Sequence, residues 1–174
     1  MRVVAGELGG RRLEAPRGAG VRPTADRVRE ALFSILGDVG GAQVLDLYCG
    51  TGALAIEAVS RGAKSAVLVD TKPAAARRNV GALEIDDRCT VVRADVVRYL
   101  GSEDGRFDLV FCDPPYSLAD RLEPELARLI PDRLAERGRV IVESDVRQPL
   151  RLELPIQVER RYGDTLILIH GGVA

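Results

Sequence analysis

Short apolar runs alternate with segments of helical periodicity from about residue 43 onward. The predicted strands cover residues 44–47, 66–69, 90–93, 109–112 and 140–143, and the predicted helices between them cover 53–60, 73–83, 96–100 and 119–135. Because these strands are apolar throughout, they predict a parallel sheet covered by helices on both faces. The last two runs, 157–161 and 166–169, flank Tyr162-Gly163-Asp164 and predict a hairpin that adds an antiparallel strand to the sheet edge.

Two further elements are predicted ahead of the sheet. Residues 1–15 have the pattern of a small β-hairpin around Gly9-Gly10. Thr24 is a candidate N-cap for a helix that stops at Gly37, with an apolar repeat at helical spacing made by Val28, Ala31, Leu32, Ile35 and Leu36. The length of 174 residues suits one domain, 1–174, in which residues 1–20 form an N-terminal hairpin extension.

The distribution of charge indicates a local anionic partner. The chain carries 25 basic and 26 acidic side chains, which excludes a uniformly basic protein that coats nucleic acid. Residues 1–30 nevertheless hold seven Arg against four acids. RNA would suit this basic end, although Arg scattered on a solvated face would give the same count. The candidate RNA contacts are Arg2, Arg11, Arg12, Arg22 and Arg29. Removal of residues 1–15 is expected to abolish any action on RNA but to leave binding of a small ligand elsewhere in the domain intact.

The composition indicates the cellular compartment and disfavours some kinds of catalytic or metal site. No run approaches the roughly 18 apolar residues of a membrane span, and no secretory leader is evident, so we expect a cytoplasmic protein. Cys49, Cys89 and Cys112 form no C-x-x-C pair and are expected to be reduced. His170 is the only histidine, so we expect neither a His-based metal site nor a nucleophile–histidine pair.

The first strand leads into a glycine-rich turn with a carboxylate behind it. In Asp46-Leu47-Tyr48-Cys49-Gly50-Thr51-Gly52, the glycines allow a tight turn and a close approach of a ligand to the main chain. The helix start offers unpaired N–H groups. The dinucleotide pattern G-x-G-x-x-G is absent, and the Asp46 carboxylate would repel a pyrophosphate. The turn therefore favours a cationic ligand, such as an ammonium or a sulfonium.

Acids also follow the next two strands. Asp70 can accept the hydroxyls of a ribose, and Asp95 can receive an adenine amine. Either one alone is better explained as a strand-end or helix-capping residue, which is common. Three acids at the carboxyl ends of three successive strands, however, favour a shared ligand site.

The most specific motif is Asp113-Pro114-Pro115-Tyr116, which follows the fourth strand. The prolines fix φ and remove two N–H donors, so the run presents acceptors beside a carboxylate and an aromatic ring. Asp113 and the Pro114 carbonyl can accept the two hydrogens of an NH2 group on a planar base. Tyr116 can stack on that base, a contact of about 1–3 kcal/mol. The alternative is a strand-terminating turn with a core tyrosine.

Together these motifs resemble the class I S-adenosylmethionine-dependent methyltransferases that methylate amino groups. Residues 22–33, 46–54 and 162–165 further resemble the RsmD family, small bacterial enzymes that methylate the exocyclic N2 of one guanine in 16S ribosomal RNA. The resemblance implies a Rossmann-like class I methyltransferase fold with a mostly parallel seven-stranded sheet. It also implies S-adenosylmethionine as cofactor, and 16S ribosomal RNA or an assembling small ribosomal subunit as partner of a monomer.

The resemblance also assigns roles to residues. The implied cofactor contacts are Asp46, Tyr48, Gly50, Gly52, Asp70, Asp95 and Val96, and the implied catalytic residues are Asp113, Pro114, Pro115 and Tyr116. Thr24 and Arg27 would contact either the cofactor's carboxylate or RNA. Two alternatives stay open: an amino-methyltransferase acting on adenine or cytosine in DNA or another RNA, and a non-catalytic nucleotide-binding regulator.

Overall fold

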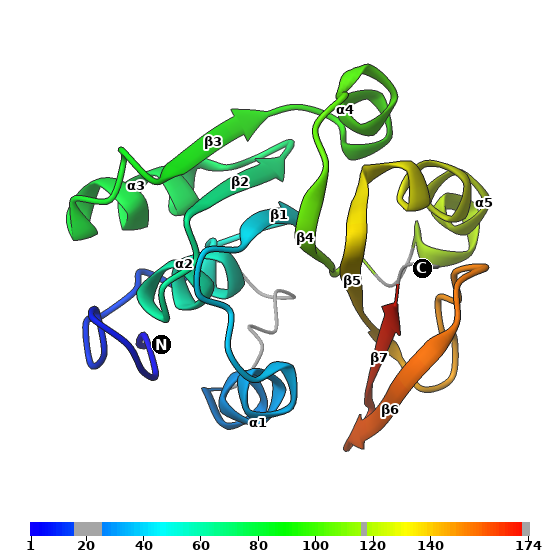
Figure 1. Cartoon of the computed structure of the whole chain (residues 1–174), viewed down its shortest axis with the longest axis horizontal. Helices are drawn as coiled ribbons and strands as arrows, with labels where there is room; N and C mark the ends of the chain where they lie inside the picture. The colour runs from blue at the N-terminus through cyan, green and yellow to red at the C-terminus, as the bar shows by residue number, and fades with distance from the viewer. Residues whose placement is uncertain (16–25, 116–117, 172–174) are drawn as a thin grey trace.

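A central sheet organises the chain in the computed structural model, which describes residues 1–15, 26–115 and 118–171 (Figure 1). Its strands are β1 (Gln43–Leu47), β2 (Ser65–Asp70), β3 (Cys89–Arg93), β4 (Phe107–Cys112), β5 (Leu134–Asp145), β6 (Ile156–Tyr162) and β7 (Thr165–Gly171). In this described part they form one seven-stranded sheet in the order β3-β2-β1-β4-β5-β7-β6. Strands β1 to β5 pair in parallel, and β7 is antiparallel to both β5 and β6. The predicted mixed sheet is confirmed.

Helices cover both faces of the sheet, as predicted. They are α1 (Asp26–Leu36), α2 (Ala53–Ser60), α3 (Ala74–Leu83), α4 (Val96–Ser102) and α5 (Ala119–Leu129), followed by the 3₁₀ turn η2 (Pro131–Arg133). Buried residues of α1, α2 and α3 share one core cluster, and those of α4 and α5 share the other. Figure 1 shows α4 and α5 across the sheet from α1 and α2. None of the described helices combines the length and hydrophobicity that a membrane span requires.

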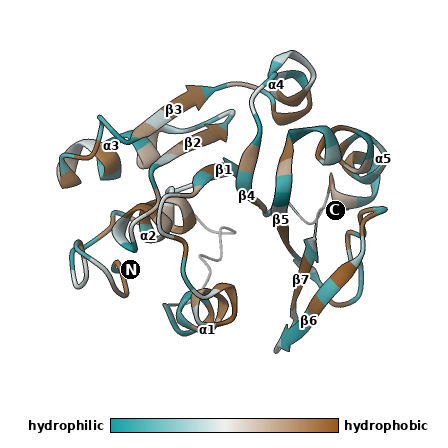
Figure 2. Ribbon diagram, viewed as in Figure 1, coloured by the Kyte–Doolittle hydropathy of each residue, from teal (hydrophilic) through white to brown (hydrophobic). Residues whose placement is uncertain are grey.

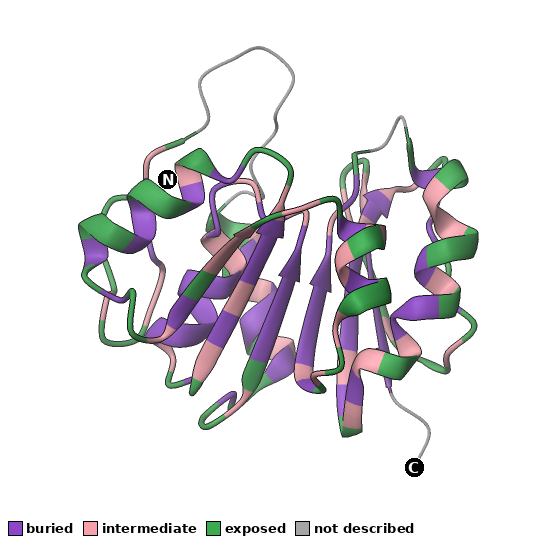
Figure 3. Ribbon diagram, turned by 90° about the horizontal axis from the view of Figure 1, so that it is seen from above, coloured by how far each residue is buried: buried purple, intermediate pink, exposed green. Residues whose placement is uncertain are grey.

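The central strands are buried because both of their faces carry apolar side chains (Figure 3). Val44 packs in the cluster of α1 to α3, whereas Leu45 and Leu47 pack in the cluster of α4 and α5. Each such side chain contributes about 1.5–3 kcal/mol through burial. Among the described strands β6 is the most exposed, and Figure 2 shows hydrophilic positions along it, as expected for a strand at a sheet edge.

The predicted helix over 119–135 is too long, and the predicted strand over 140–143 is too short. Helix α5 ends at Leu129, and β5 already begins at Leu134. Pro131 lies between them, and a proline ring both lacks an N–H donor and clashes with the preceding helical turn. The chain therefore leaves the helix at this proline, and the extra residues lengthen the strand.

The N-terminal segment, residues 1–15, is part of the core rather than a separate hairpin. Its ladder is reduced to one isolated bridge between Arg2 and Arg12, with the Val3 amide donating to the Arg11 carbonyl at 2.9 Å. Val3 and Leu13 are buried in the same cluster as α1 to α3. Removal of this segment would therefore open the core and destabilise the whole fold. The prediction that removing residues 1–15 affects RNA alone and leaves ligand binding intact is therefore corrected.

Candidate active site at the carboxyl ends of the strands

The glycine-rich loop, residues 48–52, turns sharply between β1 and α2. Tyr48, Gly50 and Gly52 have φ values of 60°, 53° and 77°, in the left-handed region. A Cβ on Gly52 would lie 2.5 Å from Leu68 Cδ2, whereas a Cβ on Gly50 would meet only the Tyr48 carbonyl oxygen, at 4.0 Å. Gly52 is thus needed for packing against β2, and Gly50 leaves the loop surface open to a ligand.

Asp46 is a buried carboxylate directly behind this loop. Its side chain lies on the sheet face that α1 to α3 cover, and its Oδ2 accepts a hydrogen bond from the Ala55 amide at 3.2 Å. Burial, with a smaller effect from the negative charge of Asp70, raises the pKa of Asp46 from 3.8 to about 7. A buried acid of this kind is stabilised by a cation brought close to it, which suits the sulfonium or ammonium expected from the sequence.

Asp70 and Asp95 both use their side chains to fix local backbone. Asp70 Oδ2 accepts from the Gly50 amide at 3.0 Å, and its Oδ1 accepts from the Lys72 amide at 2.8 Å. Each carboxylate oxygen keeps a second lone pair, so these bonds leave room for ribose hydroxyls. Asp95 caps α4 by accepting from the Arg98 amide at 3.0 Å, while the adjoining Val96 is buried.

Tyr48 shows that the site suits a polar ligand. Its hydroxyl is buried and has no hydrogen-bond partner within the described residues. Burial raises the pKa of this phenol, with further increases from nearby Cys112, Asp95 and Asp70. An unpaired buried hydroxyl costs about 1–3 kcal/mol. A ligand carrying polar groups between Asp70 and Asp95 would satisfy it, so the residues present fit S-adenosylmethionine.

Asp113 extends the row of acids across β4. In the register of the sheet Cys112 lies beside Leu47 at the end of β1 and beside Val142 of β5, so the next residue, Asp113, lies next to Glu143 of β5. Burial, followed by the charges of Glu143 and Asp46, raises the pKa of Asp113 well above 3.8. We call Asp46, Asp70, Asp113 and Glu143 the acidic edge. Glu143 was not among the predicted site residues, although its place at the end of the predicted strand 140–143 was a signal for it.

The rest of the acceptor motif is only partly described. Pro114 is buried and Pro115 is exposed, and the Pro115 carbonyl accepts from the Leu118 amide at 2.8 Å ahead of α5. Tyr116 lies outside the described residues, as do Thr24 and Arg22. Among the described residues, no group of three His, Cys, Asp or Glu side chains is arranged to hold a metal ion.

The candidate RNA-binding arginines differ in accessibility. Arg2, Arg11, Arg12 and Arg27 are exposed, and Arg11 Nη2 donates to the Ala82 carbonyl at 3.2 Å. The assignment of Arg29 to RNA is wrong, because its side chain is fully buried. Its guanidinium donates to the Arg2 carbonyl and to Asp26 Oδ1, the latter at 3.0 Å. Arg29 thus joins α1 to the N-terminal segment.

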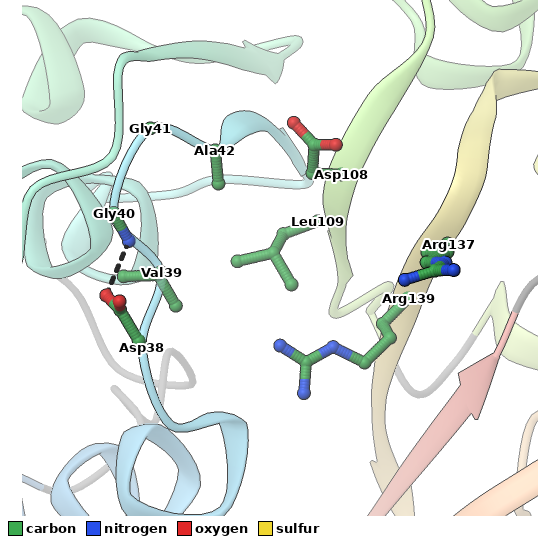
Figure 4. A pocket seen from close by; sticks show the side chains of 9 residues that line it. All are labelled: Asp38, Val39, Gly40, Gly41, Ala42, Asp108, Leu109, Arg137 and Arg139. Carbon is green, nitrogen blue, oxygen red and sulfur yellow. Dashed lines mark hydrogen bonds between the residues drawn. The ribbon is translucent and has the colours of Figure 1, made fainter.

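A hollow of about 310 Å³ lies at the opposite end of the sheet (Figure 4). It is lined by the turn 38–42, which leads into β1, and by Asp108, Leu109, Arg137 and Arg139. Arg139 Nη2 donates to the Leu36 carbonyl at 3.0 Å, and Asp108 Oδ2 accepts from the Gln43 amide at 2.8 Å. These two side chains therefore hold the end of α1 and the start of β1 in place. The hollow is at the other end of the sheet from the acidic edge.

The sheet order, the glycine-rich loop and the acids behind it define the class of the protein. Ligands of open α/β sheets bind beyond the carboxyl ends of the strands, where the acidic edge lies. A parallel sheet in which antiparallel β7 is inserted between β5 and β6 is the class I methyltransferase fold. The solved structure of "Putative methyltransferase yhhF" from Escherichia coli has this fold, with a TM-score of 0.85 and 32% identity over 100% of this chain and 98% of that one.

The family model described as "Conserved hypothetical protein 95" matches residues 1–170. The chain belongs to this family, the RsmD family that its motifs resemble. It is 36% identical over 156 residues to "Ribosomal RNA small subunit methyltransferase D" of E. coli K12, covering 86% of this chain and 77% of the relative. It is also 36% identical to "Putative rRNA methyltransferase YlbH" of Bacillus subtilis 168, covering 83% of each chain.

Proposed function

We propose that the protein is a methyltransferase that uses S-adenosylmethionine to methylate ribosomal RNA, with the exocyclic N2 amine of a guanine in 16S ribosomal RNA as its target. The observation that carries this proposal is the acidic edge, in which Asp46 lies behind a ligand-accessible glycine-rich loop and Asp113 lies next to it. The names of the relatives support an RNA of the small ribosomal subunit as substrate. The basic, exposed Arg2, Arg11 and Arg12 agree with an RNA partner.

Bound S-adenosylmethionine would supply a methyl group activated by a positively charged sulfur. Asp46, the Gly50 surface, Asp70 and Tyr48 would hold and orient it at the ends of β1 and β2. Alignment of the reacting groups alone is worth several kcal/mol.

The amine of guanine is a poor nucleophile because its lone pair is delocalised into the ring. Asp113 and the Pro114 carbonyl would accept its two N–H hydrogens and rotate that lone pair toward the methyl group. As the N–C bond forms and the S–C bond breaks, positive charge develops on the amine nitrogen. The carboxylate of Asp113 would stabilise that charge, and its raised pKa would make it a better acceptor for the released proton than an ordinary aspartate.

Transfer of tritiated methyl from S-adenosylmethionine tests the proposal. The substrates are protein-free 16S ribosomal RNA, assembling small subunits and duplex DNA, the RNA substrates coming from a strain that lacks the enzyme. We expect label in RNA or subunits and N2-methylguanine as the product after digestion and mass analysis. Label only in DNA, or a methylated adenine or cytosine, would favour the other amino-methyltransferases. Binding of the cofactor without transfer to any substrate would favour a regulator.

A further inference from the structure

The N-terminal segment is held to α2 by buried polar side chains. Glu57, which is fully buried, accepts from the amides of Val4 at 2.7 Å and Ala5 at 3.0 Å. Ser60 Oγ accepts from the Leu8 amide at 3.0 Å. Helix α2 begins directly after the glycine-rich loop, so the segment packs on the helix that the loop starts.

A second connection runs through α3 and uses one side chain. Asn79 Oδ1 accepts from the Glu14 amide at 2.7 Å, and its Nδ2 donates to the Glu14 carbonyl at 3.2 Å. The same Nδ2 donates to the Thr51 carbonyl at 3.0 Å. Thr51 stands between Gly50 and Gly52, so Asn79 bonds both the end of the N-terminal segment and the centre of the loop.

The side-chain amide of Asn79 cannot lose one of its hydrogen-bond partners without leaving a buried polar atom unpaired. Asn79 is only 3% exposed, and its acceptor and both of its donors are used by the three bonds. If the N-terminal segment moved away, Asn79 would keep buried polar atoms without partners, which is strongly disfavoured. If the loop changed shape, the Thr51 carbonyl would leave its donor. Each segment is therefore most stable when the other is in place.

We infer that Asn79 is a positioning residue that couples docking of the N-terminal segment to the shape of the glycine-rich loop, so that occupation of the loop and docking of the segment stabilise each other. The inference rests on the proposed function only in taking S-adenosylhomocysteine, the demethylated product, as the ligand of the loop. Coupling between two sites is reciprocal. The basic N-terminal segment would thus be docked more firmly, and so be better positioned for RNA, when the loop is occupied.

Hydrogen exchange on the full chain, with and without S-adenosylhomocysteine, measures this coupling. In the wild type we expect the ligand to slow exchange of the Val4 and Leu8 amides by about fivefold or more, the lower end of common allosteric couplings. In Asn79→Leu, which keeps the branching of the side chain and removes its polar atoms, the ligand effect should fall below about twofold. A purely structural residue would change the ligand-free rates but not the ligand-dependent difference.

Two variants keep the test decisive. Arg78→Ala is the matched control, because Arg78 contacts the Glu14 side chain from the same helix without reaching the loop. It should retain the full ligand effect. Asn79→Asp, which keeps an acceptor and loses both donors, should also lose the ligand effect. It replaces Asn79→Leu in the measurement if Asn79→Leu does not fold. A ligand effect that persists in the Asn79 variants, or is absent in a wild type shown by calorimetry to bind the ligand, overturns the inference.

Failure of the proposed cofactor gives a different result. If calorimetry detects no binding of S-adenosylhomocysteine, the proposed function fails. The coupling between the segment and the loop can then still be measured by hydrogen exchange in the ligand-free protein. Asn79 variants should then speed exchange of the Val4 amide and of the Gly52 amide, which donates to the Cys49 carbonyl at 2.7 Å, by similar factors. Faster exchange in one segment alone would overturn the inference.

Discussion

The Asp70 carboxylate accepts a hydrogen bond from the Gly50 amide at 3.0 Å, so the end of β2 fixes the loop that follows β1. The same carboxylate accepts from the Lys72 amide at 2.8 Å. One side chain thus holds two turns at adjacent strand ends, and each of its oxygens keeps a lone pair that could accept from the proposed ribose. Loop shape and ligand binding therefore depend on the same side chain.

Asp70→Asn should therefore weaken S-adenosylmethionine binding by about tenfold or more. An amide has one acceptor oxygen and cannot serve both backbone donors, and a hydrogen bond to a charged group is worth about 1.5–3 kcal/mol. Titration calorimetry gives the dissociation constants. Asp38→Asn is the control, because Asp38 accepts from the Gly40 amide in the hollow at the other end of the sheet. Equal affinities for the wild type and Asp70→Asn would contradict the role of Asp70.

Asp46→Asn should make the ligand-free protein more stable in a pH-dependent way. With a pKa of 3.8 unfolded and about 7 folded, Asp46 releases its proton in the unfolded chain first as the pH rises. Its carboxyl is thus compatible with folding at low pH and destabilises the fold increasingly from about pH 4 to pH 7. The full penalty above pH 7 is at most about 4 kcal/mol.

Urea unfolding at pH 5 and pH 8 measures this difference. The Asp46→Asn side chain carries no charge at either pH, so the variant should gain more stability over the wild type at pH 8 than at pH 5. It should also bind S-adenosylmethionine at least about tenfold more weakly. A stability difference independent of pH would show that Asp46 titrates normally in the folded protein.

Asp113→Ala should lower turnover by about 100-fold or more, the usual effect of removing a group that handles a proton in the transition state. Cofactor affinity should change by less than about threefold, since Asp113 is proposed to face the amine. Single-turnover rates and calorimetry separate the two quantities. The control is Asp108→Asn, at the amino end of the same strand. Equal losses in turnover and in cofactor affinity would place Asp113 in cofactor binding instead.

Alanine substitutions at the two loop glycines should differ in their main effect, one lowering stability and the other weakening cofactor binding. Gly52→Ala should destabilise the fold by about 2 kcal/mol or more, because it combines a positive φ with a Cβ 2.5 Å from Leu68 Cδ2. Gly50→Ala should cost only about 1 kcal/mol of stability, because only its φ is unfavourable, but it should impair cofactor binding. Thermal unfolding and calorimetry test the pair. Similar stability losses would contradict the packing argument for Gly52.

Arg12→Ala should weaken RNA binding without changing cofactor affinity. Arg12 is exposed, and removal of one phosphate contact should reduce the slope of log affinity against log salt by about 0.7–0.9. Fluorescence anisotropy with a 16S ribosomal RNA fragment at several salt concentrations gives this slope. Arg128→Ala on α5 is the control, and an equal effect there would mean that the protein has no localised RNA surface.

Most of the fold could be predicted because strand and helix periodicities are local. Apolar runs such as Val44–Leu47 predicted the buried strands, and their alternation with helices predicted the parallel order. The end of α5 was misjudged because an apolar pattern continues through Ile130 to Leu134 in the sequence. The backbone effect of Pro131 outweighs that pattern.

The candidate site was predictable where a motif is contiguous, as around Asp46 and Asp113. Residues that act through the tertiary structure were not. Glu143 comes next to Asp113 only through the pairing of β4 with β5, and Asn79 reaches Thr51 across 28 residues of sequence. Arg29 has the sequence signature of a basic end, yet packing of α1 against the N-terminal segment buries it.

A crystal structure with S-adenosylhomocysteine tests the central claim most directly, because that claim is a location. We predict that the ligand lies over the glycine-rich loop, with its hydroxyls within hydrogen-bond distance of Asp70 and its sulfur between Asp46 and Asp113. A ligand bound in the hollow beside Arg139, or anywhere away from the acidic edge, would contradict the account.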